Sequence, residues 1–156
     1  TPVAVADTVN FTDGGYMGLM GGSTTQMLRI REIFMGGAGT SSTPALMVFS
    51  RDSTVQATPT ALSTGESNAA LHPSTAALAA AQVAFTASTT KPQRSATLGL
   101  LSIPFNAYGG TVRWVSDPEE DMSLLGNTAS LGEVSLSAFT GGTPGLMGAS
   151  IVYEPL

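Results

Sequence analysis

The stretch TQMLRIREIF, residues 25–34, decides between a helical and an all-β fold. Apolar residues such as Ile30 and Phe34 lie three or four positions apart in it, a spacing that an amphipathic helix also shows. Its β-branched and aromatic residues, and the glycines that flank it, favour a strand. In a regular strand, Glu32 shares a face with Ile30 and Phe34. We therefore expect a β-bulge near Arg31 if that face belongs to the core.

Six further stretches have the composition of strands and are separated by turns rich in glycine and proline. They are residues 16–20, 45–50, 96–103, 111–116, 133–139 and 150–154. In two of them apolar and polar residues alternate, with Trp114 opposing Arg113 and Leu136 opposing Ser135 and Ser137, which is typical of half-buried strands. The sequence therefore predicts an all-β protein, namely an antiparallel sandwich, jelly roll or barrel of about seven or more short strands.

The chain divides into an N-terminal arm and one β domain. Residues 1–12 predict an extended arm, and residues 13–156 a single domain in which residues 51–94 form a loop-rich insertion. The alanine-rich stretch HPSTAALAAAQ in this insertion indicates one short helix, capped by Ser74 or Thr75. A loop of this length is usually functional or ordered by a partner.

Charge and composition exclude several classes of function. Only 11% of the residues are charged, against roughly 25% in an ordinary domain, and the net charge is −5. With a single lysine, no cationic patch is available for nucleic acid. No apolar run is long enough to span a bilayer. Few ions need to be desolvated when such a surface meets another protein, so we expect a homo-oligomer or an assembly component.

The residues of catalysis and metal binding are scarce. Cysteine is absent and His72 is the single histidine, which excludes thiolate and multi-histidine metal centres. The expectation is a protein that is no enzyme and has no cofactor and no metal site.

The stretch VSDPEEDMSL, residues 115–124, concentrates four of the eleven carboxylates within residues 117–121. Three interpretations are possible, namely a solvated turn, a cation site, or acid–base catalysis by Glu119 or Glu120. The spacing does not match an EF-hand, and adjacent carboxylates in an acidic run rarely face each other across a cleft. We favour the solvated turn, while a cation site at Asp117 to Asp121 stays open.

Three longer stretches resemble known proteins. LMVFSRDSTV (46–55), TKPQRSATLGLLSIPFNAYGGTVRWV (90–115) and LGNTASLGEVSLSAFTGGTPGLMGASIVYEPL (125–156) resemble capsid-associated virion structural proteins of tailed bacteriophages, the head cement or decoration proteins. The resemblance implies a homo-oligomer, with a trimer favoured, that clamps neighbouring subunits of the major capsid protein. It also implies a location on the capsid exterior and no shared catalytic residues. Thr1 followed by Pro2 fits the removal of an initiator methionine, so we expect synthesis in the host cytoplasm.

The N-terminal stretch TPVAVADTVN is a candidate for partner binding. Valine and alanine alternate in it, and an arm of this kind adds as an edge strand to a neighbouring protein or forms the first strand of its own sheet. In the first case Val3, Val5 and Val9 are the residues that we expect to contact the partner.

Two other functions remain as alternatives. A receptor- or carbohydrate-binding β-sandwich would have Trp114, Tyr108 and Arg113 near its site, because aromatic rings stack on sugars. A hydrolase would use Glu119 or Glu120.

Overall fold

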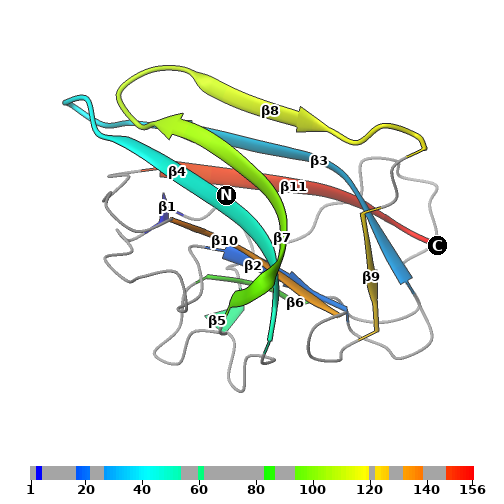
Figure 1. Ribbon diagram of the computed structural model, residues 1–156. Coiled ribbons are helices and arrows are strands. Elements are labelled where there is room, and N and C mark those ends of the chain that lie inside the picture. Colours follow the sequence, from blue (N-terminus) through cyan, green and yellow to red (C-terminus); the bar gives the residue numbers. More distant parts are fainter. Residues whose placement is uncertain are drawn as a thin grey trace.

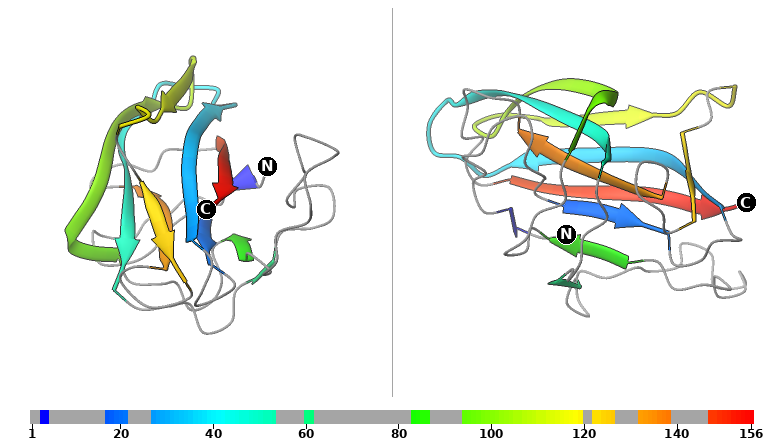
Figure 2. Two further views of the ribbon diagram at one scale, coloured as in Figure 1. Left: turned by 90° about the vertical axis from the view of Figure 1, so that its right-hand side faces the viewer. Right: turned by 60° about the horizontal axis from the view of Figure 1, so that its bottom comes forward.

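The computed structural model of this chain describes residues 3–4, 17–21, 27–53, 60–61, 83–86, 94–119, 122–126, 132–138 and 147–156. These residues form eleven strands in two antiparallel sheets that face each other (Figures 1 and 2). The described residues contain no helix, and so none with the length and hydrophobicity that a membrane crossing requires. The prediction of an all-β fold is confirmed.

Each sheet combines strands from distant parts of the chain. The first sheet has the order β1-β11-β3-β8, and β9 pairs with one end of β3; the second has the order β5-β6-β2-β10-β4-β7. The strands of the first sheet are β1 (Val3–Ala4), β3 (Met27–Gly37), β8 (Thr111–Val115), β9 (Ser123–Leu125) and β11 (Met147–Pro155). Those of the second are β2 (Met17–Met20), β4 (Pro44–Asp52), β5 (Thr60–Ala61), β6 (Val83–Thr86), β7 (Arg94–Asn106) and β10 (Glu133–Ala138).

The winding of the chain identifies the architecture as a jelly roll. In chain order, the strands β1, β2, β3, β4, β7, β8, β10 and β11 alternate between the two sheets. The one exception is the step from β4 to β7, which are neighbours in the second sheet. Eight antiparallel strands connected in this way form a jelly roll, one of the architectures that the sequence predicts. The remaining strands β5, β6 and β9 are additions to these eight.

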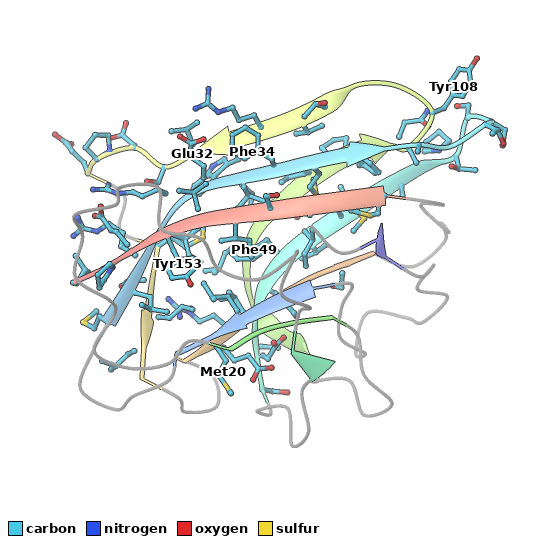
Figure 3. The ribbon with its side chains drawn as sticks, turned by 180° about the vertical axis from the view of Figure 1, so that it is seen from behind. Met20, Glu32, Phe34, Phe49, Tyr108 and Tyr153 are labelled. Atoms are coloured by element: carbon cyan, nitrogen blue, oxygen red, sulfur yellow. The ribbon has the colours of Figure 1, made fainter. Side chains whose placement is uncertain are left out.

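The core lies between the two sheets and is made by alternate residues of their facing strands. Phe49, Ile33 and Leu136 are at most 1% exposed and lie at its centre, and Figure 3 shows Phe49 between the layers. Val112 and Trp114 of β8 are half-buried and pack against this core, whereas Arg113 is exposed. The prediction of a half-buried strand is confirmed for β8.

The expected bulge occurs in β3. Val152 of β11 pairs with Glu32, but the next residue of β11 pairs with Ile30, so Arg31 is the extra residue. The bulge shifts the alternation, and Ile33 takes the core side after Ile30. Glu32 and the residues that alternate with it then face away from the core, as the sequence argument requires.

The prediction of a half-buried strand is wrong for β10. Val134 and Leu136 face the core, and Ser135 and Ser137 on the opposite side are also 0% exposed. The alternation assigns the faces of this strand correctly. It carries no information on what covers them, and here both are covered.

Three predictions concern segments that are only partly described. β1 pairs with β11 at the edge of the protein's own first sheet, with Val3 opposite Gly148, while Val5 and Val9 lie outside the described residues. The insertion contributes β5 and β6, which pair with each other and with β2. The short helix expected at Ser74 or Thr75 lies outside the described residues.

Candidate functional site: an uncharged loop end

Two connections that cross between the sheets meet at one end of the molecule. Residues 38–43 join β3 to β4, and residues 107–110 join β7 to β8. Their sequences, AGTSST and AYGG, contain no charged residue. The turn after β7 closes through Gly110, whose φ of 95° is readily adopted by glycine alone. We call these two segments together the loop end.

Asn106 fastens the two segments of the loop end to each other. Its Oδ1 accepts hydrogen bonds of 3.1 Å from the backbone N–H groups of both Thr43 and Tyr108. Its Nδ2 donates to Oγ of Ser42 over 2.8 Å. These bonds fix the backbone of both segments relative to the sheets, so little conformational entropy remains to be lost on binding.

A close backbone contact adds to this fastening. The N–H of Gly39 donates to the carbonyl oxygen of Ala107 over 2.8 Å. A Cβ atom on Gly37 would lie 2.3 Å from the Cα of Ala107, so only glycine allows this approach. The loop end is therefore a rigid unit rather than two independent turns.

Tyr108 projects from this rigid unit. Its side chain is 61% exposed, and Figure 3 shows it pointing away from the sheets. Leu46, near the start of β4, is also exposed, and so are Thr40, Ser41 and Ser42. The loop end thus presents one aromatic ring among hydroxyl groups, a surface suited to contact with another protein.

The opposite end of the sandwich carries charged residues. β8 runs from the loop end towards Asp117 and Glu119, and both are exposed. The N–H of Glu119 donates to Oδ1 of Asp117 over 2.9 Å, which is the hydrogen bond of an Asx turn. Glu120 and Asp121 lie outside the described residues. Across the described ranges, no group of three or more Asp, Glu, His or Cys side chains is placed to hold a metal ion.

The described cations of β3 and β8 are bound in ion pairs on the outer face of the first sheet. Nε and Nη2 of Arg113 donate to the carboxylate of Glu32 over 2.9 to 3.1 Å, and its guanidinium lies 5.2 Å from the ring centre of Phe34. Arg31 donates to Glu154 over 2.6 Å. These pairs reduce the net charge of that face, but they leave Arg113 in a fixed and exposed position.

The residues of the carbohydrate-binding alternative are not brought together. Trp114 packs against the core and Arg113, its neighbour in β8, faces the outer side of the sheet. Tyr108 belongs to the loop end. These three residues therefore do not form a sugar-binding surface in which an aromatic ring lies beside the guanidinium group of Arg113.

A buried polar row in the second sheet was not found from the sequence. Five side chains of β4 and β10 are buried on the face away from the core: Ser50, Asp52, Glu133, Ser135 and Ser137. Oγ of Ser135 donates to Oδ1 of Asp52 over 2.6 Å. Since both residues are 0% exposed, this pair is closed to solvent, and the hydrogen bond satisfies one buried carboxylate oxygen of Asp52. The alternation in β10 is the available signal, but serine alone does not distinguish a solvent-facing side from a covered one.

The partly buried Tyr153 in β11 should make the protein less stable to unfolding at alkaline pH. Burial raises the pKa of its hydroxyl group to about 12, whereas an unfolded chain ionises tyrosine near pH 10. Between these values the unfolded state binds fewer protons, so the free energy of unfolding falls as pH rises from about 10 to about 12. The side chain is partly solvated, so we expect a loss of only about 1 kcal/mol.

Urea unfolding of the wild type and Tyr153→Phe at pH 9 and pH 11.5 measures this effect. The wild type should lose about 1 kcal/mol more than the variant between the two pH values. Tyr108→Phe removes an exposed hydroxyl group and serves as the matched control. If the free energy of unfolding falls equally in the wild type and in Tyr153→Phe, the raised pKa of Tyr153 is not the cause.

In comparisons with known proteins, no protein-family model, curated protein or solved structure matches this chain.

Proposed function

We propose that this protein is a structural virion protein of the head cement or decoration type, which binds the major capsid protein on the capsid exterior through the loop end. The observation that carries the proposal is the loop end itself, which is uncharged and rigid and from which the exposed Tyr108 projects. The sequence resemblance supplies the kind of partner, and it also implies an oligomer, with a trimer favoured.

The physical properties of the loop end suit a permanent contact. Docking an uncharged surface removes no ion from water, so the desolvation cost is small. Asn106 already orders the two segments, which reduces the entropy lost on binding. An exposed tyrosine supplies a large contact area with few rotatable bonds, and for this reason tyrosine is frequent among the residues that dominate binding energy.

The fold is compatible with this proposal but does not decide it. Jelly rolls occur both in viral capsid proteins and in lectins, and one fold serves many functions. The separation of Trp114, Arg113 and Tyr108 favours assembly over sugar binding. For this reason we place the function at the loop end and not on the face of a sheet.

The proposal predicts that Tyr108→Ser weakens binding to capsids at least tenfold, the loss expected when an aromatic anchor is removed. Purified protein is added to capsids that lack it, and the bound fraction is measured by sedimentation and gel densitometry over a concentration series. The matched control is Leu125→Ser, which removes an apolar side chain of 45% exposure at the opposite end. This control should bind like the wild type.

Three results would overturn the proposal. The wild type could fail to bind capsids, Tyr108→Ser could bind as tightly as the wild type, or both variants could lose affinity equally. Binding of the wild type to a glycan array would point to the carbohydrate-binding alternative. Melting curves of both variants should match the wild type, because both side chains are exposed.

A further inference from the structure

β8 is an exposed edge strand. It pairs with β3 on one side, and it is the last strand of the first sheet. Figure 1 shows it at the rim, with no described segment on the side away from β3. Thr111, Arg113 and Val115 are all exposed, and Val115 is 51% exposed although it is apolar. An edge of this kind is a ready template for another strand.

The edge carries free backbone groups in a defined register. Ser116 N–H donates to the carbonyl oxygen of Arg31, which makes these two residues a hydrogen-bonded pair in the ladder. Hydrogen-bonded and non-bonded pairs alternate in antiparallel sheets. The N–H and C=O groups of Arg113 and Val115 therefore point away from β3. Within β8 itself, TVRWV contains no lysine and no proline, two residues that often protect an edge, and its one charged residue is Arg113.

The charges along this edge are self-complementary. Arg113 lies two residues before Val115, and Asp117 lies two residues after it. When two such edges pair antiparallel about Val115, Arg113 of each copy comes opposite the segment that directly follows β8 in the second copy, and this segment carries Asp117. Pairing about Arg113 instead would place two like charges opposite each other, which is unfavourable. Glu32 and Phe34 hold Arg113 in place, so little of its freedom remains to be lost on pairing.

We propose that two copies of this protein associate through β8, antiparallel and with Val115 opposite Val115, so that the first sheets of both copies become one continuous sheet. Arg113 of each copy then lies opposite the segment of the other copy that carries Asp117. The contact closes with two copies, since the same patch is used on both sides. It differs in this respect from the trimer that the resemblance implies, and it does not depend on the capsid proposal.

Cross-linking tests both the contact and its register. The chain contains no cysteine, so one introduced cysteine gives an unambiguous disulfide. In Val115→Cys the two thiols lie opposite each other, within the Cα distance of roughly 4.4–6.8 Å that a disulfide allows. In the control Thr111→Cys, on the same face of the same strand, the two Cα atoms are eight residue steps apart, roughly 26 Å.

Oxidised Val115→Cys should therefore run as a covalent dimer on a non-reducing gel, and Thr111→Cys as a monomer. Equal cross-linking of both variants would overturn the register, and cross-linking of neither would overturn the contact.

Sedimentation provides a second measurement without a covalent bond. The wild type should contain a species of twice 15.8 kDa. Val115→Lys, which adds an edge charge at an exposed position, should raise the dimer Kd at least tenfold and leave the melting temperature of the monomer unchanged. A wild type that remains at 15.8 kDa at high micromolar concentration, or a dimer with unchanged Kd in Val115→Lys, would contradict the proposal.

Discussion

Replacing Gly37 by alanine should lower the free energy of unfolding by about 3 kcal/mol and the melting temperature by roughly 10 °C. The new Cβ would lie 2.3 Å from the Cα of Ala107 and 2.6 Å from its carbonyl oxygen. Both are backbone atoms, so no side-chain rotation relieves the clash. Either the end of β3 or the turn after β7 has to move, and the hydrogen bond from Gly39 to Ala107 is strained or lost.

The matched control is Gly109→Ala in the same turn. A Cβ atom at Gly109 has no neighbouring atom within 4 Å, so this variant should unfold within about 0.5 kcal/mol of the wild type. Thermal melting by circular dichroism measures both. If Gly37→Ala melts like Gly109→Ala, the two segments of the loop end are not in contact. The rigidity on which the proposed capsid contact depends would then be absent.

Phe49→Ala should have the largest effect on the core, about 4 kcal/mol. Phe49 is 0% exposed in the middle of β4, and alanine at this position leaves a cavity between the two sheets. The midpoint of urea unfolding should shift to a much lower concentration without a change in slope, because the unfolded surface stays similar.

The informative comparison is with Phe34→Ala. The bulge at Arg31 places Phe34 on the outer face of the first sheet, where it is half-buried under the guanidinium of Arg113. This variant should lose only about 1 kcal/mol, from partial burial and the cation–π contact. A loss as large as that of Phe49→Ala would place Phe34 in the core, and the bulge would then be wrong.

The local elements of the fold could be predicted because their signals are local. Each of the seven stretches identified from composition and turns overlaps a strand, and the bulge followed from one charged residue, Glu32, in an otherwise apolar pattern. Gly110 and Gly126, which adopt positive φ, each lie in a connection between two of these stretches. Each of these inferences needs only neighbouring residues and the geometry of one strand.

The assignment of strands to sheets could not be predicted in this way. A jelly roll is defined by pairings between distant segments, such as β3 with β11 and β4 with β10, and no local pattern records which partner a strand chooses. The short strand β9 was missed because three residues give no alternation to recognise. The burial of Asp52 and Glu133 was missed for a similar reason, since acidic residues are seldom fully buried.

The sequence shows some residues of the candidate site but not how they are brought together. Low charge and the YGG turn are visible in the sequence, and Tyr108 was noted there only as part of a sugar-binding alternative. The contact of Gly37 with Ala107 and the fastening by Asn106 join segments that are more than sixty residues apart. Such contacts arise only after the sheets have formed, so the loop end emerges from the fold and not from a motif.

The in-sheet step from β4 to β7 has a consequence for how this protein tolerates changes in length. Asp52, the last residue of β4, pairs with Arg94, the first residue of β7, so the insertion that carries β5 and β6 begins and ends at the same place in the second sheet. The entropic cost of closing such an excursion grows only with the logarithm of its length, by about 0.6 kcal/mol per doubling. Peptides can therefore be grafted between these two residues without altering the winding of the eight principal strands. This makes the step a natural position for displaying foreign sequence on the protein.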